Sequence, residues 1–100
     1  MAAFDNKDPE EIEIVGFDFA QRLAAGETIQ TATFTVVVLS GTDASPSSVL
    51  QGSPIIDGSI AKHMIKSGVA SVVYRITAKI TTSLGQTMVE AGNISVTEIG

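Results

Sequence analysis

Residues 70–82 read ASVVYRITAKITT, and this stretch decides the fold class. Apolar and polar side chains alternate along it, strictly so from Tyr74 to Thr81. One face carries Val72, Tyr74, Ile76, Ala78 and Ile80, and the other carries Ser71, Arg75, Thr77, Lys79 and Thr81. A repeat of two residues is typical of a strand with one buried and one solvated face. We therefore predict a half-buried antiparallel strand whose apolar face lies in the core.

Tyr74 stands near the start of this strand, shortly after the turn residues Lys66, Ser67 and Gly68. In immunoglobulin-like sandwiches a tyrosine at this place, at the start of strand F, ties down a corner through its hydroxyl group. A tyrosine on an apolar face is also commonly just part of the core, so both interpretations of Tyr74 are open. The strand itself is interpreted as strand F of such a domain.

Other segments have strand composition too. Residues 28–40 are rich in Thr, Val, Ile and Phe and contain neither Pro nor Gly, which favours a strand with Ala32, Phe34, Val36 and Val38 facing the core. In residues 12–19 the alternation of apolar side chains shifts by one position at Val15 and Gly16. Such a shift suggests a β-bulge or a strand that switches sheets. A second bulge is expected at residues 91–93.

The length of 100 residues suits one sandwich domain with its own core. Turns between short alternating segments predict an all-β fold, an immunoglobulin-like antiparallel sandwich of about seven strands over residues 12–100. Residues 1–11 form a short, polar N-terminal arm in which Phe4 is the large apolar side chain. Because so polar a segment cannot offset its ordering entropy on its own core, we expect it to be solvated or docked on a neighbour. Deleting residues 1–9 should then change the monomer's stability by no more than about 0.5 kcal/mol.

Composition argues against several classes of protein. The chain has no cysteine, so it has neither disulfides nor thiolate zinc sites, which suits assembly in a reducing cytoplasm. A net charge of −5 with six scattered basic residues argues against a nucleic-acid interface. Neither a signal-peptide pattern nor an apolar run of membrane-spanning length is present, so we expect no membrane association.

Candidate catalytic and metal-binding residues form no convincing group. His63 is the only histidine and is expected to be a partly exposed strand residue; its spacing from Asp57 says nothing about triad geometry. Glu11 and Glu13 alternate with isoleucines, which is typical of the wet face of a strand. The acidic residues of the arm are too few for a calcium loop, namely Asp5, Asp8 and Glu10. We therefore predict no catalytic, cofactor-binding or metal-binding residues and no enzyme activity.

Several short motifs, in this order, resemble small virion proteins of tailed phages, the fibre-tail adaptor family. They are KDPEE at residues 7–11, FDFAQRL at 17–23, GETI at 26–29, FTV at 34–36, then Tyr74, ITT at 80–82 and GQ at 85–86. Phe19 and Phe34 stand where this family usually has tryptophan, and Gln86 replaces the usual arginine. Because aromatic and arginine side chains often dominate an interface, these differences bear on docking.

The resemblance implies a non-enzymatic structural module of the virion, a tail or neck component that adapts or attaches fibres. Its expected partners are other virion proteins (tail tube, neck or fibre) and symmetric copies of itself, with no nucleic acid, membrane or cofactor. It would be synthesised and assembled in the host cytoplasm. The alternative is a carbohydrate-binding or other adhesive sandwich, although five aromatic residues without tryptophan offer little for sugar stacking. A small enzyme or inhibitor is a third possibility.

Overall fold

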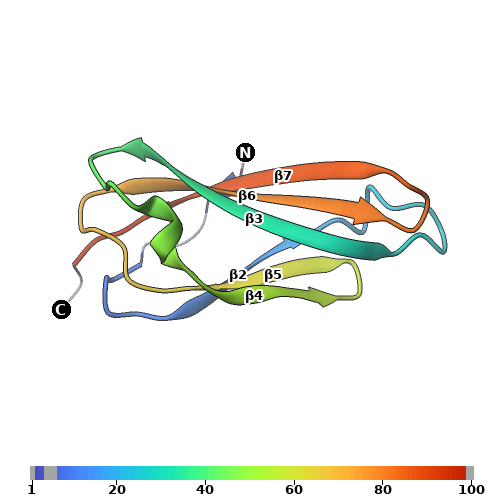
Figure 1. The fold of residues 1–100 in the computed structure, drawn as a ribbon, viewed down its shortest axis with the longest axis horizontal. Coiled ribbons are helices and arrows are strands. Elements are labelled where there is room, and N and C mark those ends of the chain that lie inside the picture. The colour runs from blue at the N-terminus through green and yellow to red at the C-terminus, as the bar shows by residue number, and fades with distance from the viewer. Residues whose placement is uncertain (1, 4–6, 99–100) are drawn as a thin grey trace.

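The computed structural model describes residues 2–3 and 7–98 and is an all-β sandwich of two sheets (Figure 1). The first sheet has the order β1-β7-β6-β3, with β1 at Ala2–Ala3, β7 at Thr87–Ser95, β6 at Val73–Thr82 and β3 at Ile29–Ser40. The second has the order β2-β5-β4, with β2 at Glu13–Asp18, β5 at Ile60–Ile65 and β4 at Leu50–Asp57. A short 3-10 helix, η1 (Pro46–Val49), leads from β3 into β4. The prediction of an all-β fold with about seven strands is confirmed, and the strand order is compatible with an immunoglobulin-like topology.

Strand β6 lies at the centre of the first sheet, antiparallel to both β3 and β7. The predicted core face is confirmed, since every member of it is buried, namely Val72, Tyr74, Ile76, Ala78 and Ile80. On β3, Phe34 and Val36 are buried, while Ala32 and Val38 pack partly buried against the same core. The alternation in the sequence therefore identified the inner face of the first sheet correctly.

Neither predicted bulge occurs. β2 pairs with β5 in unbroken register, and so does β7 with β6. The apparent phase change arose because Ile14 is apolar yet lies 50% exposed on the outer face, while Val15 and Phe17 face the core. In β7, Gly92 takes an ordinary inward position opposite Ile76. Register shifts occur instead in β4, where Gly52 has a φ of 77°, and near the two ends of β3, between Ile29 and Thr31 and between Val38 and Ser40.

The described residues at the start of the arm pair with β7 and the residues that follow it. β1 runs parallel to β7, with Ala2 opposite Gly92. Further on, Lys7 donates its backbone N–H to the carbonyl of Ser95 (2.9 Å) and accepts the N–H of Thr97 (2.7 Å). The expectation that the arm cannot fold onto its own core is therefore wrong at residues 2–3 and 7; Phe4 and Asp5 lie outside the described residues. Main-chain pairing along β7 needs no apolar side chain, so a polar segment can still offset its ordering entropy.

Candidate interaction surfaces

His63 does not lie in a catalytic arrangement. Its side chain is 3% exposed, its Nδ1 lies 2.8 Å from the carbonyl oxygen of Met64, and its ring packs against Phe34 with centroids 5.1 Å apart. The expectation of partial exposure is wrong, because β5 has apolar residues on both faces and its sequence could not decide between them. Asp57 is exposed and accepts a hydrogen bond from Lys62, whose side chain lies on the face opposite His63. The structure thus keeps Asp57 and His63 apart.

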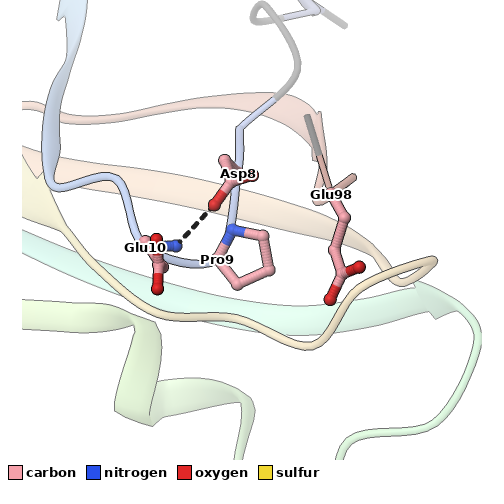
Figure 2. Close-up of a pocket in the computed structure, with 4 residues that line it drawn as sticks. All are labelled: Asp8, Pro9, Glu10 and Glu98. Carbon is pink, nitrogen blue, oxygen red and sulfur yellow. Dashed lines mark hydrogen bonds between the residues drawn. The ribbon is translucent and has the colours of Figure 1, made fainter. Parts of the chain in front are cut away.

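A hollow beside the arm is lined by Asp8, Pro9, Glu10 and Glu98 (Figure 2). The carboxylate of Asp8 accepts the backbone N–H of Glu10 (2.9 Å), and the carboxylate of Glu11 accepts the N–H of Asp8 (2.8 Å). Such bonds shape turns. Within residues 2–3 and 7–98, no three His, Cys, Asp or Glu residues are placed to hold a metal ion, and Asp5 of the acidic trio lies outside that range. Of the other carboxylate pair, Glu11 is exposed and Glu13 half-buried.

One end of the sandwich, here called the arm end, is closed by Lys7, Ser67, Val69, Tyr74 and Asp43. The Lys7 side chain is fully buried, and its Nζ donates to the carbonyl oxygens of Ser67 (2.7 Å) and of Asp8 (2.8 Å). Burial lowers the pKa of Lys7, against the opposing pull of neighbouring carboxylates. The buried ammonium group therefore ties the arm to the loop between β5 and β6.

Tyr74 fastens the same loop. Its hydroxyl accepts the backbone N–H of Val69 (2.8 Å) and donates to Asp43 Oδ2 (2.7 Å). The corner interpretation of Tyr74 is thereby confirmed, with Asp43 as an unforeseen partner. Burial raises the pKa of Tyr74, while the backbone N–H of Ser45 and then the Tyr74 hydroxyl lower the pKa of Asp43. Gly68 is required within the loop, since its φ is 92° and a Cβ there would lie 2.8 Å from Val96.

The opposite end, here called the hairpin end, is closed by Glu27, Thr28, Thr82, Ser83 and the turn through Gly85. The buried Glu27 carboxylate accepts the N–H of Ala24 (2.8 Å) and the hydroxyl of Thr82. Thr28 and Ser83 add two hydrogen bonds between the same segments, at 2.9 and 3.0 Å. Hydrogen bonds from Thr82 and then Ala24 lower the pKa of Glu27. The segment before β3 is thus bound to the β6–β7 hairpin.

The two departures to phenylalanine do not lie on the surface. Phe19 and Phe34 are both buried in the core, and Arg22 lies 6.0 Å over the ring of Phe19. Gln86, the third departure, is exposed in the β6–β7 turn. Only the change at Gln86 therefore alters a side chain that a neighbouring protein could touch.

The two outer faces of the sandwich differ in chemistry. Outside β2, β5 and β4, Ile14 lies exposed opposite the half-buried Met64, and Ile55 lies exposed opposite Lys62. Outside β3, β6 and β7, the outward positions carry six threonines and the cations Arg75 and Lys79, while the one carboxylate of these strands, Glu90, is paired with the inward Ala78. Both faces present exposed side chains that a neighbouring protein could contact.

Fold and surfaces together define a small β-sandwich module whose two ends are locked by buried polar side chains. The chain matches the family described as Podophage GP4 fiber-tail adaptor protein gp77 over residues 7–95, and it belongs to that family of phage tail components. The match begins at Lys7 and ends at Ser95, two residues joined by a backbone hydrogen bond. No curated protein matches the chain significantly. In the part of the chain that is described, no helix has the length and apolar character needed to cross a membrane.

Proposed function

We propose that this protein is a non-enzymatic structural component of a phage virion that joins fibres to the tail, in several symmetric copies. The observation that carries the proposal is the family match, which spans the sandwich from the Lys7 anchor to the end of β7. In this proposal the partners are tail and fibre proteins and further copies of the chain. Synthesis and assembly take place in the host cytoplasm, which a chain without cysteine tolerates.

The geometry supports a connecting role. The molecule measures 44 × 21 × 21 Å, and each end is closed by hydrogen bonds between segments far apart in sequence. Lys7 reaches Ser67 at the arm end, and Glu27 reaches Thr82 at the hairpin end. Such ties limit loop motion, so neighbouring proteins would meet surfaces that are already formed and lose little entropy on binding.

The positions of the aromatic side chains favour an adaptor over a carbohydrate-binding module. All four aromatic residues of the described part are buried, namely Phe17, Phe19, Phe34 and Tyr74. A sugar-binding platform presents an aromatic ring face to solvent, as other ligand-binding sites do with their aromatic linings. The described surface provides no such ring. His63, enclosed against Phe34, is likewise poorly placed for acid–base catalysis on an external substrate.

The test is a phage in which this gene is disrupted and the protein is supplied from a plasmid. Without the protein, purified particles should contain capsid but lack fibres when quantified by mass spectrometry, and the wild-type protein should restore both itself and the fibres. Particles that keep a full complement of fibres without this chain would contradict the proposal. So would wild-type particles that do not contain it.

A matched pair of variants identifies the face that is used. Ile14→Glu and Val89→Glu add the same charge at positions 50% and 49% exposed, on the outer faces of different sheets. Each variant should fold, because surface substitutions usually change stability little. Loss of incorporation for one variant alone assigns the contact to that face. If both variants incorporate normally, neither face contacts a neighbour near these positions.

A further inference from the structure

Strand β3 forms an edge of the first sheet and is the longest strand of the domain, at 12 residues. It is bonded to β6 along one side. From residue 30 to residue 40, no backbone group of its other side bonds to another segment within the described chain. A row of unpaired N–H and C=O groups of this kind is a template for a further strand.

The other three edges carry the features by which natural sheets prevent such pairing. β1 is only two residues long. β4 contains Pro54 and is broken by a register shift between Gln51 and Ile55. β2 is six residues long, contains Gly16 and carries charges at Glu13 and Asp18. Short length, proline, bulges and charges all disfavour edge-to-edge association.

β3 is long, and its register shifts lie only near its two ends, between Ile29 and Thr31 and between Val38 and Ser40. Its sequence, IQTATFTVVVLS, contains no charged residue, no proline and no glycine, and it is rich in β-branched residues. Its register with β6 is continuous from Thr31 to Val38. Of the four edges, this one is therefore both the longest and the least protected.

We infer that two copies of this chain associate by antiparallel pairing of their β3 strands. The β3 edge is suited to pairing with itself: although each copy has a net charge of −5, antiparallel β3 strands place no like charges side by side and bring threonine opposite threonine. Antiparallel pairing about a two-fold axis lets the same edge serve both partners. The inference concerns the isolated protein and does not rest on the proposed function.

The first two thirds of β3 are the better placed for pairing. Helix η1 lies beside the end of β3 that leads into it, whereas the Ile29 end is clear of that helix (Figure 1). Thr31, Thr33 and Thr35 alternate on the outer face there and are exposed. A register symmetrical about Thr33 places Thr31 of one copy opposite Thr35 of the other, and cross-strand threonine pairs are favourable.

The test compares a lysine at the edge with a lysine one strand inward. Thr35 on β3 and Thr77 on β6 lie directly opposite each other and share the outer face. We expect the wild type to form dimers in sedimentation equilibrium at concentrations up to about 1 mM. Thr35→Lys should raise the dimer dissociation constant about tenfold or more, because it places a lysine on the pairing edge opposite Thr31 of the other copy and edge lysines oppose the addition of a strand, while Thr77→Lys should leave it within about twofold.

Introduced cysteines test the register and do not depend on the lysine variants. The chain has no cysteine of its own, so a single Cys can report only on contacts between copies. Thr33→Cys should form a covalent dimer on mild oxidation, and Thr77→Cys should not, because a disulfide needs Cα atoms within about 7 Å. A wild type that stays monomeric overturns the inference and leaves the edge to a strand of another protein. A dimer equally sensitive to Thr77→Lys overturns it in favour of contact through the sheet face.

Discussion

The two ends of the sandwich are closed by buried groups of opposite charge. The surroundings of Lys7 disfavour its charged form, whereas those of Glu27 favour its charged form. At the arm end, burial works against the ammonium group of Lys7 and lowers its pKa. At the hairpin end, hydrogen bonds to Glu27 favour its charged form and lower its pKa. Lys7 has two backbone carbonyls as acceptors, whereas Glu27 receives a hydroxyl and a backbone N–H. A buried charge is well accommodated when the hydrogen bonds to it outweigh its lost hydration.

The ends also differ in what they hold. At the arm end the Lys7 side chain holds the N-terminal arm against the β5–β6 loop. The other contacts of the arm are main-chain pairs with β7 and Val96. At the hairpin end Glu27 joins two connections that are already anchored by long strands, β3 and β6. The arm end should therefore lose more stability when its polar groups are removed, and the hairpin end should respond mainly to pH.

The largest effect is expected between the ends, in the core that both share. Ile76 is fully buried at the centre of β6, so Ile76→Ala should lower the free energy of unfolding by about 2 to 5 kcal/mol through lost transfer energy and a cavity. Urea denaturation measures this. Val89→Ala, at an exposed site on β7, is the control and should stay within about 0.5 kcal/mol. Equal stability of the two variants would show that β6 does not supply the common core.

At the arm end, Tyr74→Phe removes the hydroxyl and keeps the ring. It should cost about 1 to 3 kcal/mol, because the N–H of Val69 and the carboxylate of Asp43 each lose a partner. The loop between β5 and β6 should also exchange its amide protons faster, which hydrogen exchange detects. If the loss of stability were below about 0.5 kcal/mol, the tyrosine would act through packing alone.

Lys7→Met tests the buried ammonium group. Two carbonyl oxygens lose their donor, but the charge no longer has to be buried, so the net loss should be about 1 to 2 kcal/mol. Lys79→Met, at an exposed lysine on β6, is the matched control and should change stability little. Deleting residues 1–9 should cost at least as much as Lys7→Met, since it also removes β1. A deletion without effect would restore the view of a dispensable arm.

The smallest effect is the pH response of the hairpin end. Because the pKa of Glu27 lies below its ordinary 4.5 in the folded state, its stabilising contribution is present above that pH and is lost as the pH falls through the lowered value. Glu27→Gln should therefore be less stable than the wild type at neutral pH and show a shallower loss on acidification. Asp43→Asn should act in the same sense at the arm end, from about 3.8 downward. Unfolding curves at a series of pH values check both, and parallel pH profiles for wild type and Glu27→Gln would contradict the assignment.

The sequence predicted best where one face of a strand is uniformly apolar. In β6 and β3 the period of two fixed the strand and its inner face, and the position of Tyr74 indicated a corner. It predicted poorly where the outer face also carries large apolar side chains. In β2 the exposed Ile14 produced an apparent phase change in the apolar pattern. In β5 Met64 and Ile65 made both faces apolar, so the sequence could not identify the inner face and the environment predicted for His63 was wrong. Periodicity reports a difference between two faces, so it loses its signal when both are apolar.

By itself the sequence determined the all-β class, the strands on either side of the β6–β7 turn, the glycine-containing corner, and a family resemblance that the match over residues 7–95 bears out. Only the tertiary structure decided which of its polar residues bind segments of the chain together at the two ends of the sandwich. Lys7, Glu27 and Asp43 look like surface groups in the sequence because charged side chains are seldom buried. Each of them has one hydrogen-bonding partner that lies 31 to 60 residues away along the chain, and only folding brings the two together. Local pattern therefore defines strands and their faces, whereas the closure of each end depends on contacts between segments remote in sequence.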